Sequence, residues 1–191
     1  MRAVVVYESM FGSTRQIAEA IAEGLGAEAE VQVIGVGQAE PAAGQDADLL
    51  IVGGPTHARG MSRRVTRRGA PDYLARPGSD LVLEPGADTG PGVREWLGSL
   101  GDLTAKAAAF DTRIKAPAAL TGRASKGIAK ALARAGGSVV VPAESFLVDK
   151  LGHLLAGERE RARAWGARLA TVVAPDPVPS RRNGREGPAS P

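Results

Sequence analysis

Residues 2–14 read RAVVVYESMFGST, a buried-strand pattern followed at once by a turn of small and hydroxyl residues. The β-branched run Arg2–Tyr7 is typical of a strand that is covered on both faces of a sheet. After the turn, Thr14–Leu25 carries apolar residues at helical spacing, and Gly26 stands where a helix often ends. A buried strand, a turn and an amphipathic helix predict the start of a βαβ unit with a parallel sheet.

Strand and helix patterns continue to alternate along the chain. Further strands are expected at Val31–Val36, Asp48–Val52, Ala105–Phe110 and Val139–Val141. Further helices are expected at Met61–Arg68, Val93–Leu100, Ser125–Ala135 and Glu158–Val173, with a long loop at Pro71–Pro91. This alternation predicts one doubly wound α/β domain over residues 1–173. Residues 174–191 are rich in proline and arginine and lack apolar periodicity, so a disordered tail is expected there.

Composition narrows the classes of function. The 191 residues include no cysteine, two histidines and 43% hydrophobic residues, and the net charge is +3. The absence of cysteine excludes disulfides, thiolate metal ligands and a cysteine nucleophile, and two histidines argue against a dedicated zinc site. No apolar run is long enough to cross a membrane, and no secretory signal pattern is seen. A cytoplasmic location without a transmembrane segment is therefore expected.

The loops after three of the strands are expected to carry the chemistry. They are Glu8–Thr14, Gly54–Met61 and Asp111–Pro117, since doubly wound sheets bind ligands at the carboxyl ends of their strands. The first loop offers hydroxyl groups, a glycine and the free N–H groups of a helix start, which together suit an anion such as a phosphate. Its spacing matches neither a G-x-x-x-x-G-K-[ST] nor a G-x-G-x-x-G motif. The alternative is that Ser13 or Thr14 only caps the helix.

Taken together, the loops resemble those of flavodoxin domains. Tyr7–Arg15 is similar to the first loop of that family, Gly53–His57 to the loop after the third strand, and Phe110–Arg113 to the third flavin loop. Residues 144–148 and 157–162 resemble a branch of flavodoxin-like proteins that is common in actinobacteria. The resemblance implies a five-stranded parallel sheet in the order 2-1-3-4-5, with helices on both faces. It also implies noncovalently bound FMN and electron transfer.

The resemblance further implies which residues hold the cofactor. The phosphate would be bound by the first loop, and the isoalloxazine ring would lie between the second and third loops. The residues expected to contact FMN are Ser9, Met10, Phe11, Gly12, Ser13, Thr14, Pro55, Thr56, His57, Ala58, Arg59, Gly60, Asp111, Thr112 and Arg113. No catalytic side chain and no metal are expected, because a flavin carries the redox step itself.

The chain departs from the family at the flavin-stacking aromatic residues. Flavodoxins usually stack aromatic rings on the flavin from the second and third loops, but neither loop of this chain contains Trp or Tyr. His57 and Met61 are the nearest substitutes. Weaker stacking predicts a more loosely held FMN, whose ring is open to a substrate.

A cluster of arginines follows directly on the second loop. It comprises Arg59, Arg63, Arg64, Arg67 and Arg68. Typical flavodoxin carriers are acidic, so positive charge beside the flavin predicts a docking site for a redox partner protein or a small anionic substrate. The alternative is a solvated helix face. Nucleic-acid binding is not expected, because no aromatic residues interleave with the arginines.

Three functions remain open at this point. The first is an FMN-binding electron-transfer protein. The second is a flavodoxin-like oxidoreductase that acts on a quinone or porphyrinogen, with Pro71–Pro91 as a lid. The third is a non-redox binding module that has lost FMN. Whether the chain is an enzyme is therefore left open by the sequence.

Overall fold

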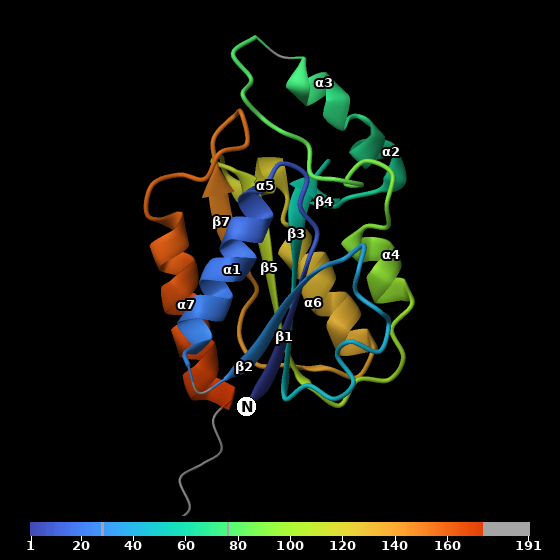
Figure 1. Cartoon of the computed structure of the whole chain (residues 1–191), viewed down its shortest axis with the longest axis vertical. Helices are drawn as coiled ribbons and strands as arrows, with labels where there is room; N and C mark the ends of the chain where they lie inside the picture. The colour runs from blue at the N-terminus through green and yellow to red at the C-terminus, as the bar shows by residue number, and fades with distance from the viewer. Residues whose placement is uncertain (28, 76, 174–191) are drawn as a thin grey trace, which may run out of the picture.

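The computed structural model describes residues 1–27, 29–75 and 77–173. These residues form a mostly parallel β-sheet with helices on both faces, and the carboxyl ends of the strands meet at the edge drawn at the top of Figure 1. The predicted tail over residues 174–191 lies outside the described residues. Within those ranges, no helix combines the length and the apolar character needed to cross a membrane.

The central strands follow the order β2-β1-β3-β5-β6. These parallel strands are β1 (Arg2–Tyr7), β2 (Glu30–Gly35), β3 (Leu49–His57), β5 (Lys106–Ile114) and β6 (Ser138–Val139). A further strand, β7 (Glu144–Val148), pairs with the second half of β5. The short β4 (Gly60–Met61) folds back antiparallel on β3.

The predicted doubly wound sheet is confirmed, although the predicted order 2-1-3-4-5 differs from the structure in detail. The fourth position is taken by β5, because β4 is only the second arm of a hairpin with β3. The edge position is shared by β6 and β7, with Pro142 between them. A proline has no N–H group for the ladder, so the edge strand is interrupted there. Only Val139 of the strand predicted at Val139–Val141 lies in β6, and β7 was not predicted.

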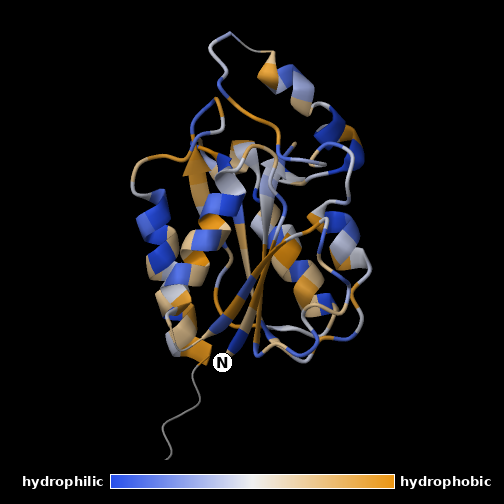
Figure 2. Cartoon of the chain, in the orientation of Figure 1, coloured by the Kyte–Doolittle hydropathy of each residue, from blue (hydrophilic) through white to orange (hydrophobic). Residues whose placement is uncertain are grey.

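Two layers of helices cover the sheet, one on each face (Figure 1). One face carries α1 (Ser13–Leu25) and α7 (Glu158–Val173), and the other carries α4 (Val93–Gly98) and α6 (Ala124–Arg134). Figure 2 shows hydrophobic residues alternating with hydrophilic ones along α1, α6 and α7, as amphipathic helices require. The helices α1 and α7 approach each other closely at Gly24, where a Cβ atom would lie 2.0 Å from the carbonyl oxygen of Arg163. Only glycine fits at that contact.

Three short helices lie at the carboxyl edge of the sheet. They are α2 (Arg64–Arg68), α3 (Ala70–Leu74) and α5 (Ala118–Thr121). The helix predicted from Met61 begins only at Arg64, because Met61 pairs with Thr56 in the β3–β4 hairpin. The predicted loop Pro71–Pro91 begins with most of α3.

Two of the predicted loops begin as strands. Because β3 continues to His57, the first residues of the predicted loop Gly54–Met61 are strand residues. Likewise β5 continues to Ile114, so that Asp111, Thr112 and Arg113 pair with β7 instead of forming a loop. Each strand thus extends its terminal side chains to the edge where the candidate site lies.

Candidate functional site

A cavity of about 620 Å³ opens at the carboxyl ends of β3, β5 and β7. Its volume is in the range of small-molecule and cofactor sites. Its walls come from the β1–α1 loop, the β3–β4 hairpin, the α2–α3 segment, α5 and the loop after β7. Most of the residues predicted to contact FMN line it, namely Met10, Phe11, Ser13, Thr14, Pro55, Thr56, His57, Ala58, Arg59, Thr112 and Arg113. Their contact with a cofactor stays a prediction.

Four of the predicted residues do not line this cavity. Ser9 and Gly12 line a second hollow of about 800 Å³ on the other side of the first loop. Gly60 faces His57 in the hairpin ladder. Asp111 is fully buried, and its Oδ2 accepts a hydrogen bond of 2.7 Å from the backbone N–H of Ser125 in the first turn of α6. Asp111 is therefore placed to hold a helix, which does not support the predicted flavin contact.

The first loop leaves the N-terminus of α1 open toward the cavity. Its N-cap residue, Gly12, has a φ of 90°, and no side chain caps the helix. The hydroxyl of Ser13 donates to the carbonyl of Gly152 at 2.6 Å, and that of Thr14 lies 2.7 Å from that of Thr112. Within the described ranges, no acceptor receives the backbone N–H groups of Ser13 and Thr14. The alternative of a simple helix cap is not supported, and an anion is the natural ligand of this end.

The segment between α3 and α4 is fastened beside the same loop. The backbone N–H of Glu84 donates to the carbonyl of Met10 at 2.8 Å. The guanidinium of Arg15 donates to the Glu84 carboxylate at 2.6 Å, and Asp80 lies 2.8 Å from His153 Nε2. These contacts hold a long connection in place and fix the outer side of the first loop.

The β3–β4 hairpin is held in a strained conformation at the mouth of the cavity. Both residues at its tip have positive φ, 44° at Ala58 and 74° at Arg59, which costs free energy for residues that carry a Cβ. Arg59 forms a parallel bridge with Gly122, where a Cβ would lie 2.1 Å from the Arg59 carbonyl oxygen. The hydroxyl of Thr56 accepts a hydrogen bond from the backbone N–H of Ala124. The hairpin is thus fixed from α5 and α6.

His57 contributes a partly buried imidazole to the cavity wall. Burial lowers its pKa, and the charge of Arg67 lowers it further. The ring is therefore neutral at ordinary pH and can lie against an apolar, planar ligand.

Three wall segments lie outside the predicted loops, namely the α2–α3 segment, α5 and the loop after β7, and the first contributes an aromatic residue. Tyr73 of α3 lines the cavity, and its ring centroid lies 6.1 Å from that of Phe11. The loop after β7 contributes Lys150, Leu151 and Gly152. If residues 144–148 had been predicted as a strand, this loop would have been a candidate too, because ligands bind at the carboxyl ends of the strands in such sheets. The remaining unpredicted wall residues are Thr66, Gly69, Ala70, Asp72, Ile114, Leu120, Thr121, Val148 and Asp149.

Positive charge lines the cavity on several sides. Arg59, Arg113 and Lys150 are all wall residues. The Nη1 of Arg113 donates to the carbonyl of Ala116 at 2.7 Å, but its buried Nε finds no acceptor among the described residues. The Nε group is enclosed by the protein, so Arg113 contributes its positive charge to the cavity wall but not this N–H group.

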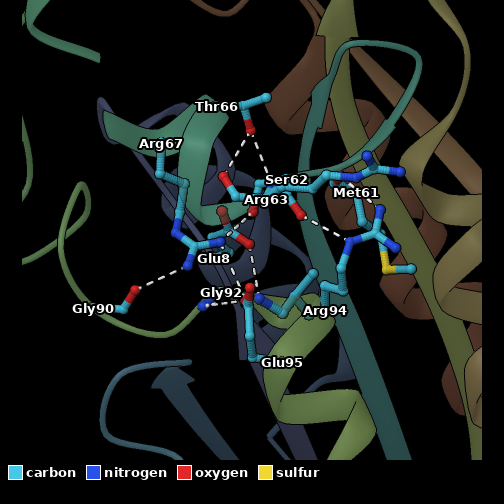
Figure 3. A network of polar contacts seen from close by, with 11 residues as sticks. Glu8, Met61, Ser62, Arg63, Thr66, Arg67, Gly90, Gly92, Arg94 and Glu95 are labelled. Atoms are coloured by element: carbon cyan, nitrogen blue, oxygen red, sulfur yellow. Dashed lines mark hydrogen bonds and ion pairs between the residues drawn. The ribbon is translucent and has the colours of Figure 1, made fainter. Parts of the chain in front are cut away.

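One member of the predicted arginine cluster is not available to any partner. Arg67 is 1% exposed and points inward (Figure 3). Its Nη1 donates to the hydroxyl of Ser62 at 3.0 Å and to the Glu95 carboxylate at 3.2 Å, and its Nη2 donates to the carbonyl of Gly90 at 3.1 Å. The predicted basic patch therefore lacks Arg67, because this guanidinium finds its acceptors on the inner side of α2.

A buried carboxylate lies next to this guanidinium. Glu8 is 3% exposed, and its Oε2 accepts a 2.8 Å hydrogen bond from the backbone N–H of Val93 in the first turn of α4. Burial raises its pKa. A Cβ at Gly92 would lie 2.2 Å from Arg67 Nη1 and 2.9 Å from Glu8 Oε2, so a glycine is needed between them. The network ties α2 and α4 to the end of β1.

Comparison with known proteins identifies the class of this fold. Residues 4–67 match the family described as a flavodoxin domain. A flavodoxin from the Archaea superposes with a TM-score of 0.60 at 21% identity, covering 91% of this chain and 99% of that one. Flavodoxin 1 from Bacillus cereus gives a TM-score of 0.62 at 21% identity, covering 90% and 98%. No match was found among curated proteins.

The described residues thus share the fold of flavodoxins, which agrees with the fold that the resemblance of the three loops implied. A further similar structure is a flavodoxin, WrbA-like protein from Agrobacterium tumefaciens, with a TM-score of 0.54 at 24% identity over 90% of this chain and 96% of that one. The proposed link to an actinobacterial branch stays a prediction.

Proposed function

We propose that this flavodoxin-like domain binds FMN noncovalently in the 620 Å³ cavity and transfers electrons. The observation that carries the proposal is the open N-terminus of α1 at the cavity wall. An anion there meets unpaired backbone N–H groups and the positive end of the helix dipole.

The donor set at the phosphate end of the cavity fits that cofactor. The N–H groups of Ser13 and Thr14 and the ammonium of Lys150 would bind the phosphate. Thr112 would fix the position of α1 through its 2.7 Å contact with Thr14.

The opposite part of the cavity suits a planar ring. Phe11, Tyr73 and the neutral imidazole of His57 supply flat or apolar surface for it. A bound flavin supplies one- and two-electron transfer chemistry. The basic residues Arg59 and Arg113 would favour negative charge on the reduced ring, by the Coulomb attraction that stabilises any nearby anion.

A second candidate is an oxidoreductase that acts on a small molecule such as a quinone or porphyrinogen. The positive charge inside the cavity supports it, because Arg59, Arg113 and Lys150 all line the wall. The third candidate, a module that has lost FMN, relied on missing aromatic residues. Phe11 and Tyr73 in the wall weaken that reason.

The test is a titration of the purified protein with FMN and, in parallel, with riboflavin, followed by quenching of flavin fluorescence. FMN is expected to bind at least about tenfold more tightly, because charge-assisted hydrogen bonds to the phosphate are worth about 1.5–3 kcal/mol. Equal affinity for FMN and riboflavin would contradict the proposed phosphate site. If a folded sample bound neither flavin, the non-redox binding module would be the best supported of the three functions. Steady-state turnover with quinones then separates an enzyme from a carrier.

The cytoplasmic location expected from the sequence stays part of the proposal. Fractionation of the producing cells, with detection of the full chain in each fraction, would test it.

A further inference from the structure

The outward side of α2 carries positive charge that the fold itself does not neutralise. We use the name α2 rim for the exposed residues Arg63, Arg64, Val65 and Arg68. Arg67 on the opposite side of the helix is bonded to Ser62, Glu95 and Gly90, so the orientation of α2 is fixed (Figure 3). The α2 rim is therefore a defined surface and not a freely turning helix.

The α2 rim combines repelling charges with an exposed apolar side chain, and both cost free energy in the isolated chain. Arg64 and Arg68 stand four residues apart, and like charges at that spacing repel each other on a helix. No ion pair between described residues includes Arg59, Arg63, Arg64 or Arg68. Val65, between the two arginines, is 74% exposed and is one of the most exposed large apolar residues described. A partner that brings negative charge and an apolar contact would relieve both features.

The α2 rim lies outside the cavity, and this position favours a protein over a small ligand as its binding partner. Thr66, Gly69 and Ala70 line the cavity, but Arg63, Arg64 and Arg68 do not. A small anion inside the cavity would meet Arg59, Arg113 and Lys150 and would leave the α2 rim untouched. Only a larger body that covers the mouth can contact Arg59 and the α2 rim together.

We infer that the α2 rim is the docking surface for an acidic redox protein, whose carboxylates pair with Arg63, Arg64 and Arg68 around Val65. The inference rests on the proposed FMN function, because it names the partner of that same cavity. Complementary charge of this kind chiefly raises the rate of encounter and orients the partner. Docking at this place brings the partner beside the mouth of the cavity.

The experiment uses a reduced acidic [2Fe–2S] ferredoxin as probe and the FMN-loaded full chain as acceptor. One electron leaves the iron–sulfur cluster and one enters the flavin, and the rate is followed by stopped flow. Arg64→Glu/Arg68→Glu is compared with Lys130→Glu/Arg134→Glu. The control pair makes the same charge change at exposed i, i+4 positions on α6, near the helix end away from the cavity.

The second-order rate constant is expected to fall about tenfold in the α2 variant and about twofold or less in the control. It is also expected to fall as ionic strength rises. In Arg64→Gln/Arg68→Gln the second-order rate constant should fall by an intermediate factor, because this variant removes the positive charge without reversing it. Equal losses in the two reversed variants, or a rate insensitive to salt, would overturn the inference.

The FMN affinity of each variant is measured first, so the cofactor and the docking surface are judged separately. If the wild-type chain binds no FMN, the proposed function fails. Calorimetric titration of the ferredoxin into the flavin-free chain then tests the α2 rim directly. Binding that is lost only in Arg64→Glu/Arg68→Glu supports the surface, and binding that is absent or unchanged refutes it.

Discussion

The side-chain hydroxyls of Thr14 and Thr112 lie 2.7 Å apart, and both residues are buried. This contact joins the first turn of α1 to β5, although 98 positions separate the residues in the sequence. It sets the distance between the helix end that faces a phosphate and the strand that carries Arg113. Changes at this contact should therefore affect stability and cofactor binding together.

Thr112→Val should lower the free energy of unfolding by about 1–3 kcal/mol, because it leaves the buried Thr14 hydroxyl without its partner. Urea denaturation of Thr14→Val, Thr112→Val and the double variant would measure the coupling. The double variant should lose less than the sum of the single losses, since no buried hydroxyl is then unpaired. Strict additivity would show that the contact does not contribute.

Gly122→Ala should weaken FMN binding by displacing the β3–β4 hairpin, because the new methyl group would lie 2.1 Å from the Arg59 carbonyl oxygen. Gly86→Ala is the matched control, since both glycines have a φ of 73° but nothing lies within 4 Å at Gly86. Each substitution should cost about 1 kcal/mol or more from backbone strain. FMN titration should show the loss of affinity for Gly122→Ala only. A similar loss for both variants would contradict this prediction.

Arg67→Met should lower the free energy of unfolding by roughly 1–3 kcal/mol, because it leaves the buried Ser62 hydroxyl and the Gly90 carbonyl without their donor. Arg68→Met, one residue further on the exposed side of α2, should change it by about 0.5 kcal/mol or less. Chemical denaturation of both variants is the measurement. If Arg67→Met proved as mild as Arg68→Met, the buried network would not be what holds α2.

Glu8→Gln should change how stability depends on pH. Burial raises the pKa of Glu8 in the folded state. The stability that its protonated form contributes is therefore fully present below the pKa of an ordinary glutamate, and it is lost as the pH rises through the higher pKa of the folded state. The Gln variant lacks this loss and should gain stability relative to wild type as pH increases from acid toward neutral. Thermal denaturation across that range, with the exposed Glu30→Gln as control, would measure it. If the difference in stability between Glu8→Gln and wild type stayed constant across this pH range, Glu8 would not titrate as predicted.

Tyr73→Leu should weaken FMN binding about two- to tenfold, since an aromatic contact is worth about 0.5–1.5 kcal/mol beyond burial. Tyr73→Phe keeps the ring and should bind FMN nearly as well as wild type. Fluorescence titration of both variants separates stacking from the hydroxyl group. Unchanged affinity in Tyr73→Leu would place the flavin ring away from α3.

Local patterns predicted much of the site. The run Arg2–Tyr7 and the helix from Thr14 lie where their periodicity indicates, and most residues predicted to contact FMN line one cavity. Such patterns are visible because neighbours in sequence determine which face of a strand or helix is apolar. The placement of Asp111 could not be predicted, because its partner Ser125 belongs to a separate helix.

The sequence by itself therefore determined the βαβ start, the alternation of strands and helices, and most of the residues that line the candidate site. Only the tertiary structure decided that Arg67 is buried, that β7 completes the edge beside β5, and that Tyr73 and Lys150 reach the cavity. The reason is physical: each of these depends on partners distant in the chain. A charged side chain is buried only where the fold brings buried acceptors to it, and a short edge strand forms only where another strand offers its free backbone groups.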